Sequence, residues 1–366
     1  MLPIAAALAI AAGCNLETPS QTPGCQRAVI DRTVRMDQIQ ALGTHNSYKR
    51  AIAPAEMTML RASSPKSAGG LDYAHPSLTE QLNAGARAIE IDIMYDPEGG
   101  RYADPMLYRM ATANGGTTQP YDATPMKKPG MKVLHIQDID FRSNCALFVD
   151  CLKELKAWSD AHKDHVPILL TMNLKDDDVK APGTVHALKF DAKAMDAIDA
   201  EIRSVFKPRD LITPDNLQGR YPTLAAAAAA HAWPKLGAAR GRFLFAMDED
   251  QPKITVYQGA RHSLEGRVLF VNAALDSPLS AYITLNEPIT HPDDIRTALA
   301  AGKLVRTRAD GDTVEARTND TARREAAFAI GAQYVSTDYM QADTRLSSYR
   351  VTMPGGVVAR INPLEH

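Results

Sequence analysis

The residues best suited to do chemistry are two histidines, His45 and His135, and two carboxylates, Glu90 and Asp92. Histidine titrates near neutral pH, so one imidazole can take a proton from an attacking hydroxyl while another returns a proton to a leaving group. Glu90 and Asp92 stand two residues apart in an apolar stretch typical of a strand, so both side chains point to the same face. Together these residues indicate acid–base chemistry beside a charged centre.

Two carboxylates on one interior face repel each other unless a positive group lies between them. A hard divalent cation with oxygen ligands meets that need, and Asn46 and Asn173 offer neutral amide oxygens to the same ion. A buried ion-pair network with Lys175 or Arg306 meets the need as well. The spacing by itself leaves both interpretations open.

Further polar residues follow other predicted strands. Lys175, Arg306 and Arg308 are candidates for contacts with a phosphate, and an arginine can make such a contact with two parallel hydrogen bonds. Tyr339 is a candidate for stacking on a substrate ring. The alternatives are surface salt bridges for the arginines and ordinary packing for the tyrosine.

Short apolar runs typical of strands alternate with helical patterns along most of the chain. We predict nine strands, at 39–48, 86–95, 131–140, 166–177, 241–249, 267–275, 281–288, 303–310 and 333–340. This alternation favours an α/β fold with a parallel sheet, and eight strands closed into a distorted TIM-type (β/α)8 barrel are the simplest solution. Functional groups should then lie at the C-terminal strand ends, where the candidates stand. An open doubly wound sheet is the alternative, but no glycine-rich nucleotide-binding motif supports it.

The remaining segments complete the expected organisation. Residues 96–130 show no clear period and predict a long insertion after the second strand, of the kind that shapes a substrate mouth. The barrel is predicted to span 37–345, with a tether rich in Thr, Pro, Ser and Gln at 15–36 and a C-terminal extension at 346–366.

The first 14 residues are an apolar run of small side chains, typical of a signal peptide or a lipoprotein signal. In one interpretation Cys14 becomes the lipidated first residue, and in the other cleavage after Ala11 leaves Cys14 free. Both predict export, to a secreted, periplasmic or lipid-anchored state. No later run is long enough for a transmembrane helix.

The cysteines agree with export. Cys145 and Cys151 are close enough to form a disulfide in an oxidising compartment, although two reduced buried thiols are the alternative. Cys14 and Cys25 allow a second disulfide if Cys14 is not lipidated.

Charge and composition exclude some partners. A formal net charge of −2 and a pI of about 6.6 argue against a nucleic-acid partner, which would favour a basic surface. The hydrophobic and charged fractions are ordinary for a globular protein, and we expect a monomer.

Several ordered motifs resemble a known family. The first four are LGTHNSY, ARAIEIDIMYD, VLHIQDIDFRSNCALFVDCLKEL and PILLTMNLKDD. These segments are similar to the catalytic half of phosphatidylinositol-specific phospholipase C, and most similar to the bacterial calcium-dependent phosphoinositide group. Later motifs extend the resemblance over roughly 37–345: SP-x-x-AYI-x-x-NEP, LVRTRAD and ARTNDTARREAAFAIGAQYVSTDY. Glycerophosphodiester phosphodiesterases share the barrel and the motif order, so the resemblance defines the superfamily better than the substrate.

The resemblance implies a role for each histidine. His45 matches the histidine that assists attack by the inositol 2-hydroxyl, and His135 matches the general acid for the diacylglycerol leaving group.

The resemblance also implies calcium as cofactor. Asn46, Glu90 and Asp92 match calcium ligands, while Asn173 stands where animal relatives have a fourth ligand, Glu. A neutral ligand compensates the cation less, so either affinity is lower or Asp176 contributes.

The expected function is therefore an exported Ca²⁺-dependent phosphoric diester hydrolase. It would cleave phosphatidylinositol-type phospholipids at a membrane surface to diacylglycerol and a cyclic or open inositol phosphate. A glycerophosphodiester phosphodiesterase and an inactive lipid- or glycan-binding barrel are the alternatives.

Overall fold

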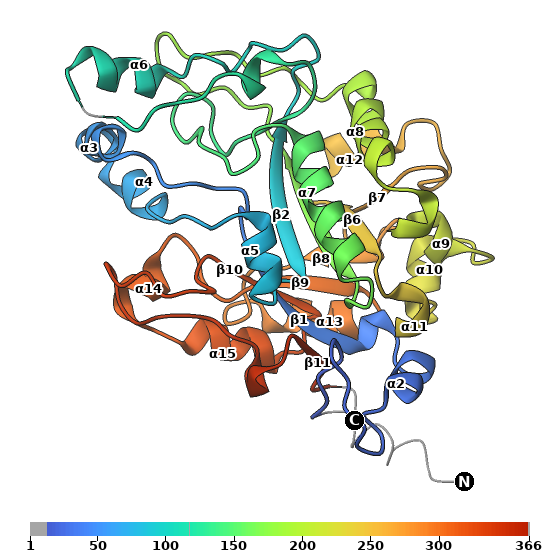
Figure 1. Cartoon of the computed structure of the whole chain (residues 1–366). Helices are drawn as coiled ribbons and strands as arrows, with labels where there is room; N and C mark the ends of the chain where they lie inside the picture. The colour runs from blue at the N-terminus through green and yellow to red at the C-terminus, as the bar shows by residue number, and fades with distance from the viewer. Residues whose placement is uncertain (1–12, 117, 365–366) are drawn as a thin grey trace.

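The structure is a computed structural model that describes residues 13–116 and 118–364. The predicted signal segment lies almost entirely outside these residues. A sheet of mainly parallel strands forms the centre, and helices surround it (Figure 1). The strands are buried along almost their whole length, because helices cover the outer face and side chains fill the interior.

Eight parallel strands follow one another around the sheet. They are β1 (Ile39–Thr44), β2 (Ala88–Met94), β4 (Ile168–Leu174), β6 (Phe243–Met247), β7 (Leu269–Val271), β8 (Tyr282–Thr284), β9 (Leu304–Arg308) and β10 (Tyr334–Thr337). Parallel ladders connect β8 through β9, β10, β1, β2, β4 and β6 to β7. One parallel bridge, Asn272 to Tyr282, links β7 to β8. The predicted distorted TIM-type barrel is confirmed.

The pairing of β1 with β2 depends on a glycine. These strands share a single residue pair, Gly43 with Ala88. A Cβ atom at position 43 would lie 2.3 Å from both the Cβ and the carbonyl oxygen of Ala88. The two strands that carry His45 and Glu90 therefore approach each other as closely as they do only because residue 43 has no side chain.

Three shorter strands lie outside this circuit: β3 (Lys132–Val133), β5 (Leu211–Ile212) and β11 (Ala359–Ile361). The strand predicted at 131–140 is wrong in extent and direction, because β3 has two residues and pairs antiparallel with β2. The chain then turns back, since the backbone N–H groups of His135 and Ile136 both donate to the carbonyl of Asp140, while Asp138 adopts a left-handed φ of 68°. His135 therefore stands on a loop within the excursion between β2 and β4, and not at the end of a barrel strand.

The helices fill the connections and cover the outside of the barrel. They are α2 (Arg27–Thr33), α3 (Pro54–Ser63), α4 (Pro65–Gly70), α5 (Leu78–Asn83), α6 (Met106–Ala113), α7 (Phe148–Ala161), α8 (Ala192–Val205), α9 (Pro214–Gln218), α10 (Leu224–Ala229), α11 (Leu236–Ala239), α12 (Gln251–Gln258), α13 (Pro292–Ala300), α14 (Val314–Thr318) and α15 (Ala322–Ala329). Helix α7 shows why they form: Phe148, Leu152 and Leu155 recur at helical spacing, and all three are fully buried.

The predicted insertion after the second strand forms a separate layer. Residues 96–130 contain α6 and irregular loops, and α6 packs beside α3. In Figure 1 this layer lies at the top of the molecule, beyond the end of β2.

The predicted tether at 15–36 is wrong, because this segment packs against the barrel. Leu16 is fully buried, and the Glu17 carboxylate binds the Arg87 guanidinium and accepts a hydrogen bond from the Val166 N–H at 2.8 Å. A polar composition suggested flexibility, but a buried cation and an apolar site on the barrel fix these two residues.

The predicted extension after residue 345 likewise belongs to the fold. Strand β11 pairs antiparallel with β1, so the last described residues add an edge to the strand that carries His45.

Two disulfides join the four cysteines, Cys145–Cys151 and Cys14–Cys25, with Cα separations of 5.3 Å and 5.5 Å. The predicted first pair is confirmed. Among residues 13–116 and 118–364, no helix has the length and apolar character needed to cross a membrane.

Candidate functional site

The carboxyl ends of the barrel strands open onto a cavity of about 180 Å³, called the polar cavity below. Every residue that lines it is polar or charged: His45, Asn46, Glu90, His135, Asn173, Lys175, Asp248, Asn286, Arg306 and Arg308. Eight of these stood among the ten residues predicted to bind or catalyse. Asp92 contacts two of the lining residues, and Tyr339 is the one predicted residue that lies elsewhere.

His45 follows β1 and is held from both sides. Its Nδ1 lies 2.8 Å from an Asp338 carboxylate oxygen and 3.3 Å from the Tyr73 hydroxyl, while its Nε2 lies 3.3 Å from Arg308 Nη1. Burial, together with the charge of Arg308, lowers the pKa of His45. A neutral imidazole with Nδ1–H directed to Asp338 leaves Nε2 as a proton acceptor on the polar cavity.

Asp338 is the anion that fixes this arrangement. Burial alone would raise its pKa, but the charges of His45 and Arg308 outweigh burial and hold the pKa of Asp338 well below its usual range. The carboxylate also pairs with Arg308 at 3.0 Å. It therefore orients the histidine and the arginine together.

Asn46 sits in the tight turn after β1. Its φ of 47° is in the left-handed region, which asparagine tolerates better than most residues. The amide nitrogen donates to the Tyr73 hydroxyl at 2.8 Å, and the next residue, Ser47, accepts a hydrogen bond from the Glu90 N–H at 2.9 Å. The turn is thus attached to β2, which brings Asn46 to the side of the carboxylates.

Glu90 and Asp92 both point into the barrel, as their spacing predicted. The Arg306 guanidinium donates to Glu90, and Lys175 Nζ lies 3.0 Å from Asp92 Oδ2. The Asn173 amide nitrogen lies 3.1 Å from an oxygen of each carboxylate. The ion-pair network that the sequence left open is therefore present.

The charges around Glu90 favour its ionised form. Burial would raise its pKa, but the charges of Arg306 and His45 outweigh burial and lower the pKa of Glu90. The charge of Asp92 in turn raises the pKa of Lys175 more than burial lowers it. The Lys175 ammonium is thus favoured where it contacts Asp92.

The donors around the two carboxylates also fit a hard cation. Asp92 Oδ2 is buried and faces the Lys175 ammonium at 3.0 Å, so a cation that takes the place of this lysine meets a carboxylate oxygen there. The Asn173 amide already lies against both carboxylates, and turning it by half a rotation presents its oxygen at the same place. With Asn46 on the same cavity, two carboxylates and two amide oxygens are available. Within the described part of the chain, no three His, Cys, Asp or Glu side chains are arranged to hold a metal, so a cation here depends on the amides.

His135 reaches the polar cavity from the loop after β3. Its Nδ1 lies 2.9 Å from Asp140 Oδ2, so the carboxylate binds one ring nitrogen and leaves the other, Nε2, for a substrate. Each histidine therefore has a carboxylate at Nδ1 and lines the same cavity.

Sequence reasoning missed four residues of this site. Asp248 and Asn286 follow predicted strands, and the strand-end rule applied throughout would have found them. Burial raises the pKa of Asp248, whose carboxylate accepts a hydrogen bond from Asn272. The sequence does not indicate Tyr73 and Asp140, because each belongs to the site only through its contact with another residue, Tyr73 with His45 and Asp140 with His135.

Tyr339 does not reach the polar cavity. It is buried, packs edge-on against Tyr349 with ring centroids 5.8 Å apart, and lines a separate cavity of about 300 Å³ outside the strands. Tyr339 therefore packs as an ordinary buried side chain, which was the alternative to stacking on a substrate ring.

A larger groove of about 770 Å³ adjoins the polar cavity and shares His45, His135 and Arg308 with it. Its outer walls come from α4 and from the segment that begins α14. Pro65, Leu71 and Val314 give these walls an apolar part, and Lys66 and Arg317 add positive charge.

Comparison with known proteins shows the family and the fold of the chain. Residues 34–363 match the family described as "Phosphoinositide phospholipase C, Ca²⁺-dependent". A calcium-dependent phosphoinositol-specific phospholipase C from Pseudomonas sp., solved in an apo form and with myoinositol, is similar in fold at a TM-score of 0.54 and 16% identity. That match covers 92% of this chain and 97% of the other.

A Ca²⁺-dependent phosphatidylinositol-specific phospholipase C from Streptomyces antibioticus gives a TM-score of 0.52 at 17% identity, covering 84% of this chain and 95% of the other. No curated protein sequence matches the chain. The family match covers most of the chain, and the solved structures show the same barrel. The chain belongs to the Ca²⁺-dependent phosphoinositide phospholipase C family and is a phosphoric diester hydrolase.

Proposed function

We propose that this enzyme cleaves phosphatidylinositol-type phospholipids to diacylglycerol and a cyclic or open inositol phosphate by paired histidine catalysis. The observation that carries the proposal is the polar cavity itself. Two histidines, each with a carboxylate at Nδ1, line it together with a carboxylate pair and three cationic side chains. This arrangement supports attack on a negatively charged phosphodiester, which needs a base, an acid and charge compensation.

His45 acts as the base in this proposal. Its lowered pKa favours the neutral ring, and its Nε2 faces the cavity between Arg308 and Glu90. Nε2 takes the proton of the inositol 2-hydroxyl as that oxygen attacks phosphorus. The imidazolium that forms is stabilised by Asp338, which lies 2.8 Å from Nδ1.

His135 acts as the acid. It lines both the polar cavity and the larger groove, so a leaving-group oxygen at the boundary between them is within its reach. In this step His135 is the imidazolium, stabilised by Asp140 at Nδ1, and its Nε2–H gives a proton to the diacylglycerol oxygen as the P–O bond breaks. The groove, with its apolar and basic walls, suits a lipid leaving group.

Calcium, when bound, neutralises phosphate charge and lowers the pKa of the attacking hydroxyl. Asn46, Glu90, Asp92 and Asn173 would hold it. Lys175 and Arg306 now pair with the two carboxylates, and both also line the cavity, so they can turn to the phosphate oxygens when the carboxylates bind the cation.

The far side of the polar cavity supports a polyol headgroup. Asp248 and Asn286 supply hydrogen-bond acceptors there, and Arg306 donates to the Asn286 side chain at 2.7 Å. Ring hydroxyls can donate to these acceptors, which a glycerol headgroup would use only in part.

A substrate panel tests the proposal. Purified protein should release inositol phosphate from phosphatidylinositol vesicles with added Ca²⁺ and lose that activity in EDTA, with recovery when Ca²⁺ is restored. Equal activity in EDTA would contradict the calcium role. Preference for glycerophosphocholine over phosphatidylinositol would instead assign a glycerophosphodiesterase.

We also propose that the protein works outside the cytoplasm as a released enzyme. Two disulfides are typical of oxidising compartments. The Cys14 sulfur is bonded to Cys25, and a sulfur in a disulfide cannot carry a lipid. Mass spectrometry of the exported protein should find both disulfides and no lipid, and a lipidated Cys14 would contradict the released form.

A further inference from the structure

A buried ion pair lies behind His135. The side chains of Lys49 and Asp140 are both completely inaccessible to solvent, and Lys49 Nζ lies 3.2 Å and 3.1 Å from the two carboxylate oxygens. Lys49 comes from the turn after β1, and Asp140 from the end of the His135 loop. The pair therefore joins the two segments that carry the catalytic histidines of the proposed function.

Stability does not explain this pair. Removing two charges from water costs several kcal/mol per ion, and an apolar pair of similar volume is often as stable or more stable. The other contacts of Lys49 Nζ are weak by comparison: the Arg50 carbonyl at 3.5 Å and the face of the Tyr73 ring at 4.8 Å. A lysine and an aspartate at these positions thus call for a reason beyond packing.

The geometry around Asp140 supplies that reason. Its Oδ2 lies 2.9 Å from His135 Nδ1 and 3.1 Å from Lys49 Nζ, so the same oxygen serves both. Its backbone carbonyl accepts from the N–H groups of His135 and Ile136, which closes the loop. An anionic Asp140 accepts a hydrogen bond from Nδ1–H and so directs the other ring nitrogen, Nε2, to the substrate.

We propose that Lys49 and Asp140 are positioning residues for the general acid of this enzyme. Lys49 keeps Asp140 ionised and in place, and Asp140 binds the Nδ1–H of His135, which fixes the ring orientation and stabilises the imidazolium whose Nε2 carries the transferred proton. The proposal rests on the proposed function, since it assigns His135 the transfer of a proton to the leaving group.

Burial and charge agree with this. Burial alone would raise the pKa of Asp140, yet Lys49 and His135 outweigh it, so the pKa of Asp140 is lowered. Without Lys49 the carboxyl group would be buried with one cationic neighbour fewer, and a protonated Asp140 can donate to Nδ1. Donation there would keep the ring neutral, because no anion would remain to stabilise the imidazolium, and a neutral imidazole is a much weaker acid.

Lys49 also touches the surroundings of the other histidine. Its ammonium lies over the Tyr73 ring, and the Tyr73 hydroxyl lies 3.3 Å from His45 Nδ1 and accepts from Asn46. Lys49 therefore contacts Tyr73, which lies beside His45, and Asp140, which lies beside His135. Of these two neighbours only Asp140 is charged and contacts a ring nitrogen, Nδ1 of His135.

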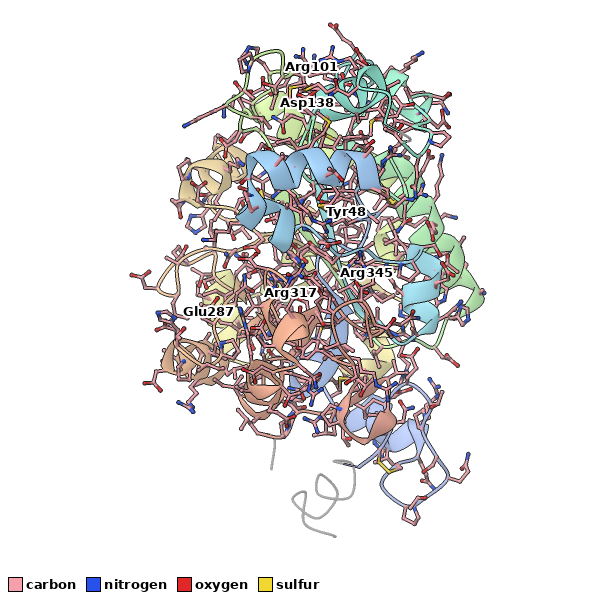
Figure 2. All side chains as sticks on the ribbon, turned by 90° about the vertical axis from the view of Figure 1, so that its left-hand side faces the viewer. Tyr48, Arg101, Asp138, Glu287, Arg317 and Arg345 are labelled. Carbon is pink, nitrogen blue, oxygen red and sulfur yellow. A yellow bond between two sulfur atoms is a disulfide. The ribbon has the colours of Figure 1, made fainter. Side chains whose placement is uncertain are left out.

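The same loop offers a matched control in Asp138, two residues earlier. It is also a buried aspartate, but its carboxylate accepts from the Met106 and Val185 N–H groups at 2.8 Å and 2.7 Å, which fixes α6 and the 175–190 segment. Figure 2 shows Asp138 in the upper part of the molecule with Arg101, above Tyr48. Asp138→Asn weakens the loop without changing the hydrogen bond to His135.

The test compares two leaving groups at saturating Ca²⁺. Phosphatidylinositol has an alkoxide leaving group that needs the acid, whereas an aryl ester of inositol phosphate has an acidic phenol that needs it much less. We expect Asp140→Asn and Lys49→Met to lower kcat/KM roughly 10²-fold on the lipid and only slightly on the aryl ester. Asp138→Asn should affect both substrates equally, and Lys49→Arg, which keeps the charge, should preserve the wild-type ratio.

Thermal unfolding and far-UV circular dichroism show whether each variant folds. If a single variant does not fold, Lys49→Met/Asp140→Asn removes both charges and leaves neither buried alone, and it should show the same selective loss as Asp140→Asn. Equal losses on both substrates for the folded Lys49 and Asp140 variants would overturn the inference. Wild-type protein that cleaves neither substrate would overturn the proposed function instead, so the two failures are distinguishable.

Discussion

At the scale of single residues, the neighbours of a side chain decide what it can do. The two histidines of the proposed mechanism have the same ring, but their partners differ. His45 has Asp338 on one nitrogen and Arg308 on the other, whereas His135 has Asp140 on Nδ1 and presents Nε2 to the cavity. Burial and the arginine beside His45 lower the pKa of the ring and favour its neutral form, which is the form a base needs. Different partners thus suit similar rings to different tasks.

Asp338 is predicted to be essential for the use of His45. Asp338→Asn removes the charge that stabilises the imidazolium and that pairs with Arg308. We expect kcat on phosphatidylinositol to fall roughly 10²- to 10⁴-fold with a smaller change in KM. Asp343→Asn, five residues later and paired with Arg345 outside the polar cavity, is the control and should retain activity. Similar kinetics for the two variants would contradict the role of Asp338.

Because of Asp310, part of the free energy of unfolding should decrease as pH rises. Burial and the neighbouring charge of Asp338 raise the pKa of Asp310 to about 7 in the folded state, against about 3.9 for an unfolded chain. Between those values the folded state binds more protons, so this group stabilises the fold at low pH and its contribution is lost as pH rises from about 4 to about 7. The lowered pKa of Asp338 acts in the other direction, but below that window.

Urea unfolding of wild type and Asp310→Asn at pH 4.5 and 7.5 measures this. The stability of wild type relative to the variant should decrease by a few kcal/mol at the higher pH. A relative stability that does not change with pH would show that Asp310 is ionised throughout.

At the scale of elements, close contact between β1 and β2 places His45, the proposed base, beside the carboxylates. Gly43 makes that contact possible, since any Cβ there would overlap Ala88. The turn after β1 then bonds to Glu90 through Ser47. A small change in the distance between β1 and β2 would therefore move both His45 and the carboxylates.

Gly43→Ala is predicted to destabilise the fold and the site together. Overpacking of this kind costs typically about 1–3 kcal/mol, and the forced strand shift should lower kcat as well. Differential scanning calorimetry and kinetics measure the two effects. Gly69→Ala is the control, because a Cβ at position 69 meets no atom within 4 Å. Wild-type melting temperature for Gly43→Ala would contradict the close approach.

At the scale of the whole molecule, closure of the barrel gathers distant segments around one small volume. His45 and Asp338 lie 293 residues apart in the chain, and Glu90 and Arg306 lie 216 apart. A ligand that binds this volume contacts several strands at once. Cation binding should therefore stabilise the entire barrel by mass action.

Asn173→Glu tests that linkage by adding a third carboxylate beside Glu90 and Asp92. We expect a lower melting temperature than wild type in EDTA, because like charges then face each other, and a larger rise on addition of Ca²⁺. Titration of Ca²⁺ followed by thermal unfolding measures both. Asn173→Gln keeps a neutral amide and is the control. An unchanged response to Ca²⁺ in Asn173→Glu would place the cation elsewhere.

The sequence determined the barrel and most of its polar cavity. Alternation of apolar runs identified the eight segments that become barrel strands. Side chains at the strand ends of a parallel barrel meet at one face, so His45, Glu90, Asn173 and Arg306 could be grouped in advance. Strands could be predicted from local sequence because a buried strand needs apolar residues along its own length.

Only the tertiary structure decided which side chains pair across the cavity. Arg306 with Glu90, Lys49 with Asp140 and Tyr73 with His45 come from segments whose separation depends on strand register and closure, which no local pattern encodes. The His135 loop was mistaken for a barrel strand for the same reason, since a short apolar run does not reveal its direction of pairing. The polar composition of residues 15–36 predicted a flexible tether. The segment is instead held against the barrel by contacts with buried residues from other parts of the chain.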